Sequence, residues 1–166
     1  MSFGKKWLPG LLAMLLVAPL AHAQRAIFLV RHAEKLYNSD ESHVPLSEAG
    51  RARAEALAHL LKEAGITAIY STKTVRTLST VRPLSLALRL KVTVADQNDA
   101  HALVARIRKE NATSIVLIVG HANTVPEILY ALGYPEEFRI RSNEFDNLFV
   151  VQPNGPNPPT VLRLRY

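Results

Sequence analysis

Short apolar stretches alternate with longer amphipathic stretches along most of the chain. The short stretches are rich in Val, Ile and Leu and are predicted strands, at residues 26–30, 66–70, 92–95 and 115–119. The longer stretches carry apolar residues at helical spacing and are predicted helices, at residues 47–64, 73–88, 99–109 and 124–132. Ser47 is a natural N-cap for the first helix, and Pro83 is expected to bend or restart the second.

The C-terminal region departs from this rhythm. Residues 148–151 and 161–165 are predicted strands, and the Pro- and Gly-rich stretch 153–159 between them is predicted to be a loop. Strands that alternate with helices form parallel sheets with helices on both faces. We therefore predict an α/β fold, a three-layer sandwich with a mostly parallel sheet and a C-terminal edge hairpin.

The N-terminal region has the pattern of a signal peptide. Lys5 and Lys6 precede an apolar run over residues 8–20, and Ala21-His22-Ala23 has the small-x-small form of a cleavage site. The run is shorter than the ~20 residues of a membrane-spanning helix, so no stable membrane anchor is expected after cleavage. The predicted organisation is a signal peptide at 1–23 and one domain at 24–166, periplasmic or secreted.

Composition narrows the chemistry. The chain has 48% hydrophobic and 20% charged residues, which is typical of a globular domain, and its 0 Cys residues exclude cysteine nucleophiles and thiolate metal sites. Without Lys5 and Lys6, 18 basic residues stand against 14 acidic ones, a net charge of +4. The basic residues are scattered, so nucleic acid is not an expected partner.

Two predicted strands end in residues that folding alone does not require. The first runs into Arg31-His32 and the fourth into Gly120-His121, while Arg76 follows the second strand. Ligands of open α/β sheets bind at the carboxyl ends of the strands. Arginine binds phosphate oxygens with a planar fork that never deprotonates. Neighbouring cations should also lower the pKa of His32 and keep it neutral and nucleophilic, so we expect a phosphoryl site here.

Four ordered blocks carry a family resemblance. They span nearly all of the predicted domain and are Arg31-His32-Ala33-Glu34 with Asn38, Leu46-Ser47-Glu48-Ala49-Gly50, Tyr70-Ser71 with Arg76-Thr77-Leu78-Ser79-Thr80, and Val119-Gly120-His121. Together they resemble the histidine phosphatase superfamily, also called phosphoglycerate mutase-like. Ala33 stands where the family usually has glycine.

The resemblance implies a role for each matched position. His32 is similar to the nucleophile that becomes phosphohistidine, Arg31, Arg76 and His121 to the ligands of the phosphoryl group, and Asn38 to a phosphate-contacting asparagine. It implies neither a metal nor an organic cofactor. The expected activity is that of a histidine acid phosphatase-like phosphomonoesterase, acting on a phosphorylated small molecule, glycan or phosphoprotein. The alternatives are a phosphomutase of the same family and a non-catalytic phosphate-binding module.

The family's proton donor has no clear counterpart. An aspartate that can follow the second histidine is replaced by Ala122. Asp96 and Asp99, after the third predicted strand, and Glu34, beside the nucleophile, are the three candidate carboxylates. The sequence does not decide among them.

Overall fold

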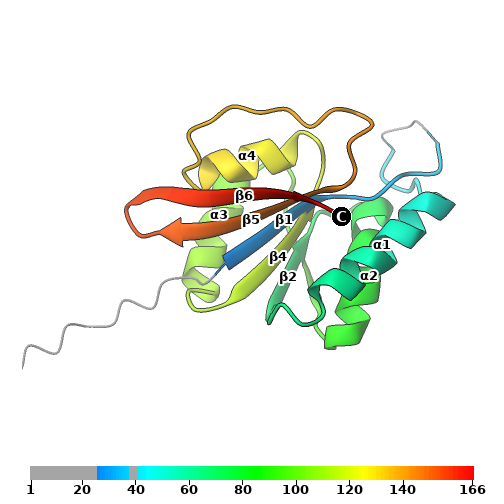
Figure 1. Ribbon diagram of the computed structural model, residues 1–166, viewed down its shortest axis with the longest axis horizontal. Coiled ribbons are helices and arrows are strands. Elements are labelled where there is room, and N and C mark those ends of the chain that lie inside the picture. The colour runs from blue at the N-terminus through cyan, green and yellow to red at the C-terminus, as the bar shows by residue number, and fades with distance from the viewer. Residues whose placement is uncertain (1–25, 38–40) are drawn as a thin grey trace, which may run out of the picture.

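The computed structural model describes residues 26–37 and 41–166 and shows a six-stranded sheet between two pairs of helices (Figure 1). The strands are β1 (Ala26–Arg31), β2 (Ala68–Ser71), β3 (Val92–Val94), β4 (Ile115–Gly120), β5 (Asn147–Asn154) and β6 (Asn157–Arg165). The helices of the described residues are α1 (Glu48–Leu61), α2 (Val75–Leu88), α3 (Ala100–Glu110) and α4 (Thr124–Ala131). The predicted three-layer α/β fold with a C-terminal edge hairpin is confirmed.

The sheet has the strand order β3-β2-β4-β1-β5-β6. Its first four strands are parallel, whereas β5 runs antiparallel to β1 and β6 antiparallel to β5. The sheet is therefore mixed, and the prediction of a mostly parallel sheet holds for its first four strands. Strands β1 and β4 are neighbours in a register that pairs Arg31 with Gly120. This register brings the two strand ends that carry histidine side by side.

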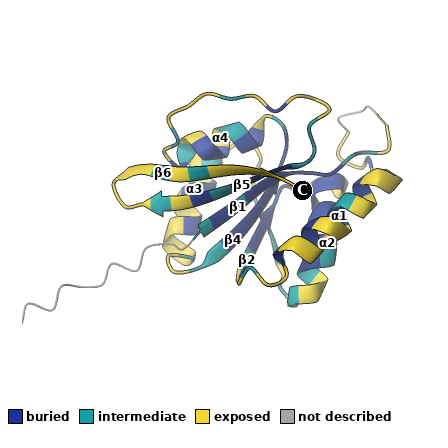
Figure 2. Ribbon diagram, viewed as in Figure 1, coloured by how far each residue is buried: buried dark blue, intermediate teal, exposed yellow. Residues whose placement is uncertain are grey.

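Helices cover the two faces of the sheet in pairs. On one face α3 and α4 pack against Ile27 and Leu29 of β1, and on the other α1 and α2 pack against Val30. Successive side chains of a strand point to opposite faces, so a strand covered on both sides is apolar throughout. Figure 2 shows the central strands buried between the helices. This double burial explains the continuous apolar run of β4.

One prediction about proline was wrong. Most of the predicted loop 153–159 is strand, because β5 extends to Asn154 and β6 resumes at Asn157 around Gly155, whose φ is +58°. Prolines are tolerated in edge strands, and β6 is one of the two edge strands of this sheet. Helix α2 also continues through Pro83 without a restart. Its residues Val81 and Leu84 are fully buried, and this packing offsets the loss of one helical hydrogen bond.

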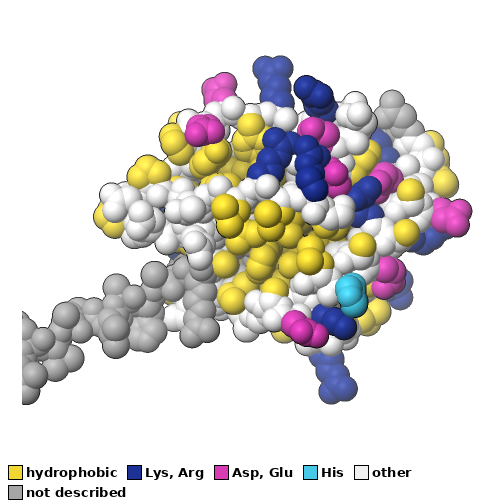
Figure 3. All heavy atoms as spheres, viewed as in Figure 1, with side chains coloured by type: hydrophobic (Ala, Val, Ile, Leu, Met, Phe, Trp, Pro, Cys, Tyr) yellow, Lys and Arg dark blue, Asp and Glu magenta, His cyan; other side chains and the backbone are white. Residues whose placement is uncertain are grey.

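Helices α1 and α2 leave part of their face of the sheet uncovered. Leu162 and Leu164 of β6 are 56% and 47% exposed. Leu162 pairs across the sheet with Val150, which pairs with Phe28, so these side chains form one apolar row. Figure 3 shows apolar side chains gathered on this part of the sheet.

The predicted signal peptide at residues 1–23 lies outside the described residues. Within residues 26–37 and 41–166, no helix has the length and apolar character needed to cross a membrane.

Candidate active site

The two histidines meet at the carboxyl ends of β1 and β4. The backbone N–H of His32 donates to the Gly120 carbonyl at 2.9 Å, which continues the β1–β4 ladder by one residue. The rings of His32 and His121 lie edge to face, with centroids 5.3 Å apart. Arg31 and Arg76 are buried beside them. The structure thus brings four of the five predicted site residues together, and the fifth, Asn38, lies outside the described residues.

The His32 ring has a defined orientation. Its Nδ1 lies 2.7 Å from the carbonyl oxygen of Ala33. In the neutral ring this bond places the hydrogen on Nδ1 and leaves the lone pair on Nε2. Ala33 therefore supplies the acceptor that fixes the direction of a nucleophilic nitrogen.

The environment of His32 strongly favours its neutral form. Burial is the largest effect and lowers the pKa of His32 to about 3, against an opposing hydrogen bond to Ala33 and with further lowering by Arg31, His121 and Arg76. The pKa of His32 is shifted in the direction that the sequence predicted from the neighbouring arginines. The main cause of this shift is burial and not the arginines, because loss of hydration disfavours the charged imidazolium more than the nearby cations do.

Arg31 is held by a loop far away in the sequence. Its Nη1 donates to the carbonyls of Arg141, Ser142 and Glu144 at 2.9, 3.1 and 3.0 Å. The ring of Phe145 lies 4.0 Å from the guanidinium carbon of Arg31, and 6.0 Å from the His32 ring. Sequence reasoning missed segment 141–145, since no strand end or motif marks it and its role depends on backbone carbonyls.

Arg76 connects the second histidine to a loop on the other side of the site. Its Nη1 donates to the Glu41 carbonyl at 2.8 Å, and its Nη2 lies 3.5 Å from Nδ1 of His121. A guanidinium can only donate, so Nδ1 of His121 carries the lone pair and Nε2 the hydrogen. That hydrogen points to the Thr72 hydroxyl, 2.8 Å away, and Thr72 in turn donates to Thr77.

Thr80 links helix α2 to the nucleophile. Its hydroxyl accepts the Ala33 N–H at 2.9 Å and donates to the Arg76 carbonyl at 2.7 Å. Four residues make about one helical turn, so Arg76 and Thr80 lie on the same side of α2. The Arg-x-x-x-Thr spacing thus allows one helix to place Arg76 beside His121 and Thr80 against the Ala33 N–H.

Gly50 and Ser47 anchor the segment after His32. The Ser47 N–H donates to the Glu34 carbonyl at 2.9 Å, and the Ser47 hydroxyl caps α1 by accepting the Gly50 N–H at 3.1 Å. A Cβ at Gly50 would lie only 2.1 Å from the Glu34 oxygen. The Leu-Ser-x-x-Gly block therefore provides a cap and the close approach of α1 to the catalytic strand end.

The three candidate carboxylates have different surroundings. Glu34 forms a bidentate pair with Arg53, at 2.6 and 2.9 Å. Burial acts to raise the pKa of Glu34, but the hydrogen bonds and charge of Arg53 outweigh it and hold that pKa below its usual value. Asp99 caps α3 by accepting the Ala102 N–H at 2.7 Å. Neither carboxylate is placed to give up a proton at the site.

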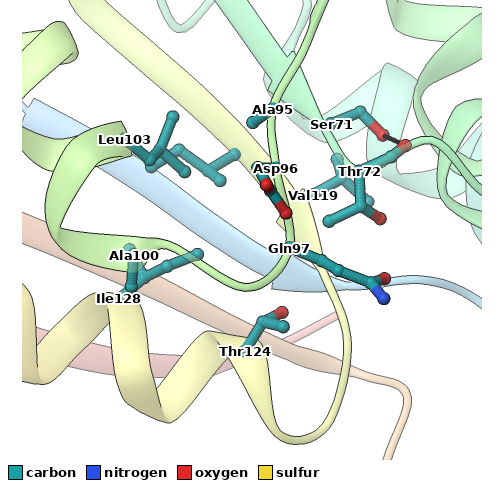
Figure 4. Close-up of a pocket in the computed structure, with 11 residues that line it drawn as sticks. Ser71, Thr72, Ala95, Asp96, Gln97, Ala100, Leu103, Val119, Thr124 and Ile128 are labelled. Carbon is teal, nitrogen blue, oxygen red and sulfur yellow. Dashed lines mark hydrogen bonds between the residues drawn. The ribbon is translucent and has the colours of Figure 1, made fainter.

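Asp96 borders a cavity that a neighbour of His121 also borders. It accepts the Asn98 N–H at 2.9 Å and borders a small cavity of about 10 Å³, together with Ser71 and Thr72 (Figure 4). A space of this size admits about one water molecule. Thr72, which borders the same cavity, contacts His121 at 2.8 Å.

Among residues 26–37 and 41–166, no group of three or more His, Cys, Asp or Glu side chains has the geometry to hold a metal ion.

One family model matches part of the chain. Residues 27–99 match the model of the histidine phosphatase superfamily (branch 1). The matched region contains Arg31, His32 and Arg76, whereas His121 lies beyond it and is placed by the fold. No curated protein matches the chain in sequence.

Solved structures share the fold across most of the chain. The protein histidine phosphatase SixA complexed with tungstate is 18% identical with a TM-score of 0.68, over 84% of this chain and 96% of that one. YhfR of Bacillus stearothermophilus is 15% identical with a TM-score of 0.68, over 82% and 95%. A mycobacterial glucosyl-3-phosphoglycerate phosphatase with inorganic phosphate is 16% identical with a TM-score of 0.67, over 86% and 96%. At these identities the matches establish a common fold.

Residues 27–99 are thus similar in sequence to the histidine phosphatase superfamily (branch 1), and most of the chain shares the fold of the phosphatases named above.

Proposed function

We propose that this protein is a phosphomonoesterase that works through a phosphohistidine intermediate on His32. The observation that carries the proposal is the state of that side chain. His32 is buried, its pKa is held far below its usual value, its Nδ1 lies 2.7 Å from the Ala33 carbonyl, and Arg31, Arg76 and His121 are near enough to lower that pKa further. A neutral nucleophile among cations suits attack on a phosphate dianion.

The first half of the reaction forms a P–N bond and breaks a P–O bond. Nε2 of His32 attacks the phosphorus in line with the leaving oxygen, which departs with a proton. The phosphoryl-transfer transition state is loose and spreads negative charge over the equatorial oxygens. Arg31 and Arg76 supply donors and positive charge around those oxygens, which is the main way such sites lower the barrier, and His121 lies between Arg76 and Thr72 beside them.

The second half reverses the geometry with water. A water molecule gives a proton to the carboxylate that protonated the leaving oxygen and attacks the phosphorus, the P–N bond breaks with its electron pair returning to Nε2 of His32, and inorganic phosphate leaves. Hydrolysis requires that water reach the intermediate. The short chain leaves little sequence for the long insertions that enclose substrates in the mutases, which favours a phosphatase over a phosphomutase.

Asp96 is the proposed proton donor to the leaving oxygen. It borders the cavity beside Thr72, whereas Glu34 is paired with Arg53 and Asp99 caps α3. A general acid typically contributes 10²- to 10⁴-fold, and it matters most for a poor leaving group. An alkyl phosphate should therefore depend on Asp96 far more than an activated aryl phosphate does.

The substrate class follows from the site and from the predicted signal peptide. Relatives of the same fold are described as a protein histidine phosphatase and a glucosyl-3-phosphoglycerate phosphatase, and they bind tungstate and phosphate. We propose a phosphorylated component of the cell envelope or a scavenged phosphoester, reached after export to the periplasm or beyond. Phosphoprotein, glycan and small phosphoester substrates all present the same dianion to the site.

The deciding experiment is an intact-mass spectrum of the chain from Gln24 onward, quenched at alkaline pH shortly after mixing with an aryl phosphate. We expect an acid-labile adduct of one phosphoryl group that is absent from His32→Ala. His32→Ala should lose turnover while still binding phosphate, whereas Arg31→Ala and Arg76→Ala should weaken both. Normal turnover by His32→Ala would refute the mechanism. Phosphate binding without any released alcohol would favour a phosphate-binding module.

A further inference from the structure

We propose that Glu144 is a positioning residue that holds the catalytic guanidinium of Arg31 in place through the turn at residues 141–144. The inference rests on the proposed function, because it takes Arg31 as a ligand of the phosphoryl group. Glu144 itself does not touch the reacting atoms. It acts on a set of three backbone carbonyls, those of Arg141, Ser142 and Glu144, which we call the arginine cradle.

The arginine cradle determines where the guanidinium lies. Nη1 of Arg31 donates to all three carbonyls at 2.9 to 3.1 Å, and the Phe145 ring lies against the guanidinium carbon at 4.0 Å. A guanidinium is a rigid plane, so fixing one nitrogen and one face fixes the other nitrogens as well. Misplacement of such a ligand by about 1 Å can cost on the order of 10²-fold in rate.

Glu144 closes the turn that presents these carbonyls. Its Oε2 accepts the Arg141 N–H at 2.9 Å, and its own N–H donates to the Arg141 carbonyl at 3.0 Å. The hydrogen bond from the Arg141 N–H is the largest cause that holds the pKa of Glu144 below its usual value. Residues 141–144 have no helix or strand to hold them, so this side chain is the main local constraint on the cradle.

The C-terminal hairpin supports the turn from outside. The Glu144 carboxylate lies 3.6 Å from Arg163 and 3.4 Å from Arg165 of β6, and Arg165 also pairs with Asp146. Basic and acidic side chains lie side by side above β6 (Figure 3). These arginines are 40% and 49% exposed, and exposed ion pairs contribute only about 0–1 kcal/mol each. The bond of Glu144 to the turn should therefore matter more than its ion pairs.

The test is a double-mutant cycle with two readouts. Glu144→Ala is made in the native protein and in Arg31→Ala, and inorganic phosphate affinity is measured by NMR titration alongside kcat/KM for an aryl phosphate. In the native background we expect each quantity to fall about 10-fold. In the Arg31→Ala background we expect less than about 2-fold, because coupled residues are not additive. Glu137→Ala, on the same loop, is the matched control and should change neither.

A second variant separates positioning from folding. Glu144→Gln keeps an oxygen for the Arg141 N–H and loses the ion pairs, so it should lie between the native protein and Glu144→Ala. If Glu144→Ala does not fold, the cycle is completed with Glu144→Leu, which likewise offers no acceptor to the Arg141 N–H. The inference would be overturned if phosphate affinity and kcat/KM fell equally in the native protein and in Arg31→Ala. It would also be overturned if a folded Glu144→Ala protein lost neither. The binding readout needs no turnover, so a native protein that binds phosphate without hydrolysing it would refute the proposed function and still test the cradle.

Discussion

Replacing Thr80 with valine should destabilise the protein and misplace its nucleophile. Thr80 is 0% exposed, and its hydroxyl is the acceptor for the N–H of Ala33, which is also 0% exposed. Valine has nearly the same shape, so no cavity forms. The change removes only the hydroxyl, and it does so directly behind the carbonyl that orients His32.

The expected loss of unfolding free energy is that of one buried N–H group left without an acceptor. The Arg76 carbonyl keeps its place in the helical ladder of α2, whereas the Ala33 N–H loses its acceptor. Leaving a buried N–H unsatisfied costs about 1–3 kcal/mol. In a domain of this size each kcal/mol lowers Tm by about 2–4 °C. The Tm of Thr80→Val should therefore fall by several degrees although valine is the more hydrophobic residue.

Thermal and denaturant unfolding measure this cost, and kcat/KM at a temperature well below Tm measures the effect on the site. Thr80→Ser is the control, because it keeps the hydroxyl and loses one methyl group, worth about 1 kcal/mol. Thr80→Ser should retain near-native activity, whereas Thr80→Val should lose activity about 10-fold. A Thr80→Val protein as stable and active as the native one would show that the hydroxyl does not hold the Ala33 backbone.

Three further predictions concern pH, packing and proton transfer. In the folded chain the pKa of His32 is about 3, whereas in the unfolded chain it is about 6.5. Between these pH values the unfolded state binds more protons than the folded state, so the free energy of unfolding falls as the pH drops from about 6.5. From pH 7 to pH 5 the native protein should lose about 2 kcal/mol more unfolding free energy than His32→Asn does, and equal losses in denaturant titrations would contradict this origin. Gly50→Ala should lower the free energy of unfolding by about 1–3 kcal/mol, because the added Cβ would lie 2.1 Å from the Glu34 carbonyl oxygen. Alanine normally stabilises a solvent-exposed helix relative to glycine, so a rise in Tm would show that this clash does not occur. Asp96→Asn should slow hydrolysis of an alkyl phosphate about 100-fold and of an activated aryl phosphate less than about 5-fold, and similar losses for both would remove Asp96 as the proton donor.

Local patterns were enough to predict the main elements of the fold. The apolar runs that end in Arg31-His32 and in Gly120-His121 marked two buried strands, and burial on both faces explains why those runs do not alternate. The C-terminal hairpin was also predicted, although its strands are longer than expected, because prolines at 158 and 159 fall in an edge strand. Composition alone cannot show that a strand is at an edge.

Spacing showed which residues belong to the site but not how they act. The Arg-x-x-x-Thr and Leu-Ser-x-x-Gly blocks could be recognised, whereas the contact of Thr80 with Ala33 and the close approach of Gly50 to Glu34 depend on how α1 and α2 pack on the end of β1. Among the candidate carboxylates, the sequence could not separate Asp96 from Glu34. Only the ion pair of Glu34 with Arg53 does so.

The sequence by itself determined the order of strands and helices, the types of side chain at the strand ends and thus the phosphoryl chemistry to which they are suited. The tertiary structure decided that β1 and β4 are neighbours in register, that the Ala33 carbonyl orients His32, and that carbonyls at positions 141, 142 and 144 hold Arg31. The reason is physical. Strand and helix preferences depend on residues a few positions apart, whereas register, burial and backbone hydrogen bonding arise from contacts between segments as many as 113 residues apart, and every amino acid carries the same carbonyl group.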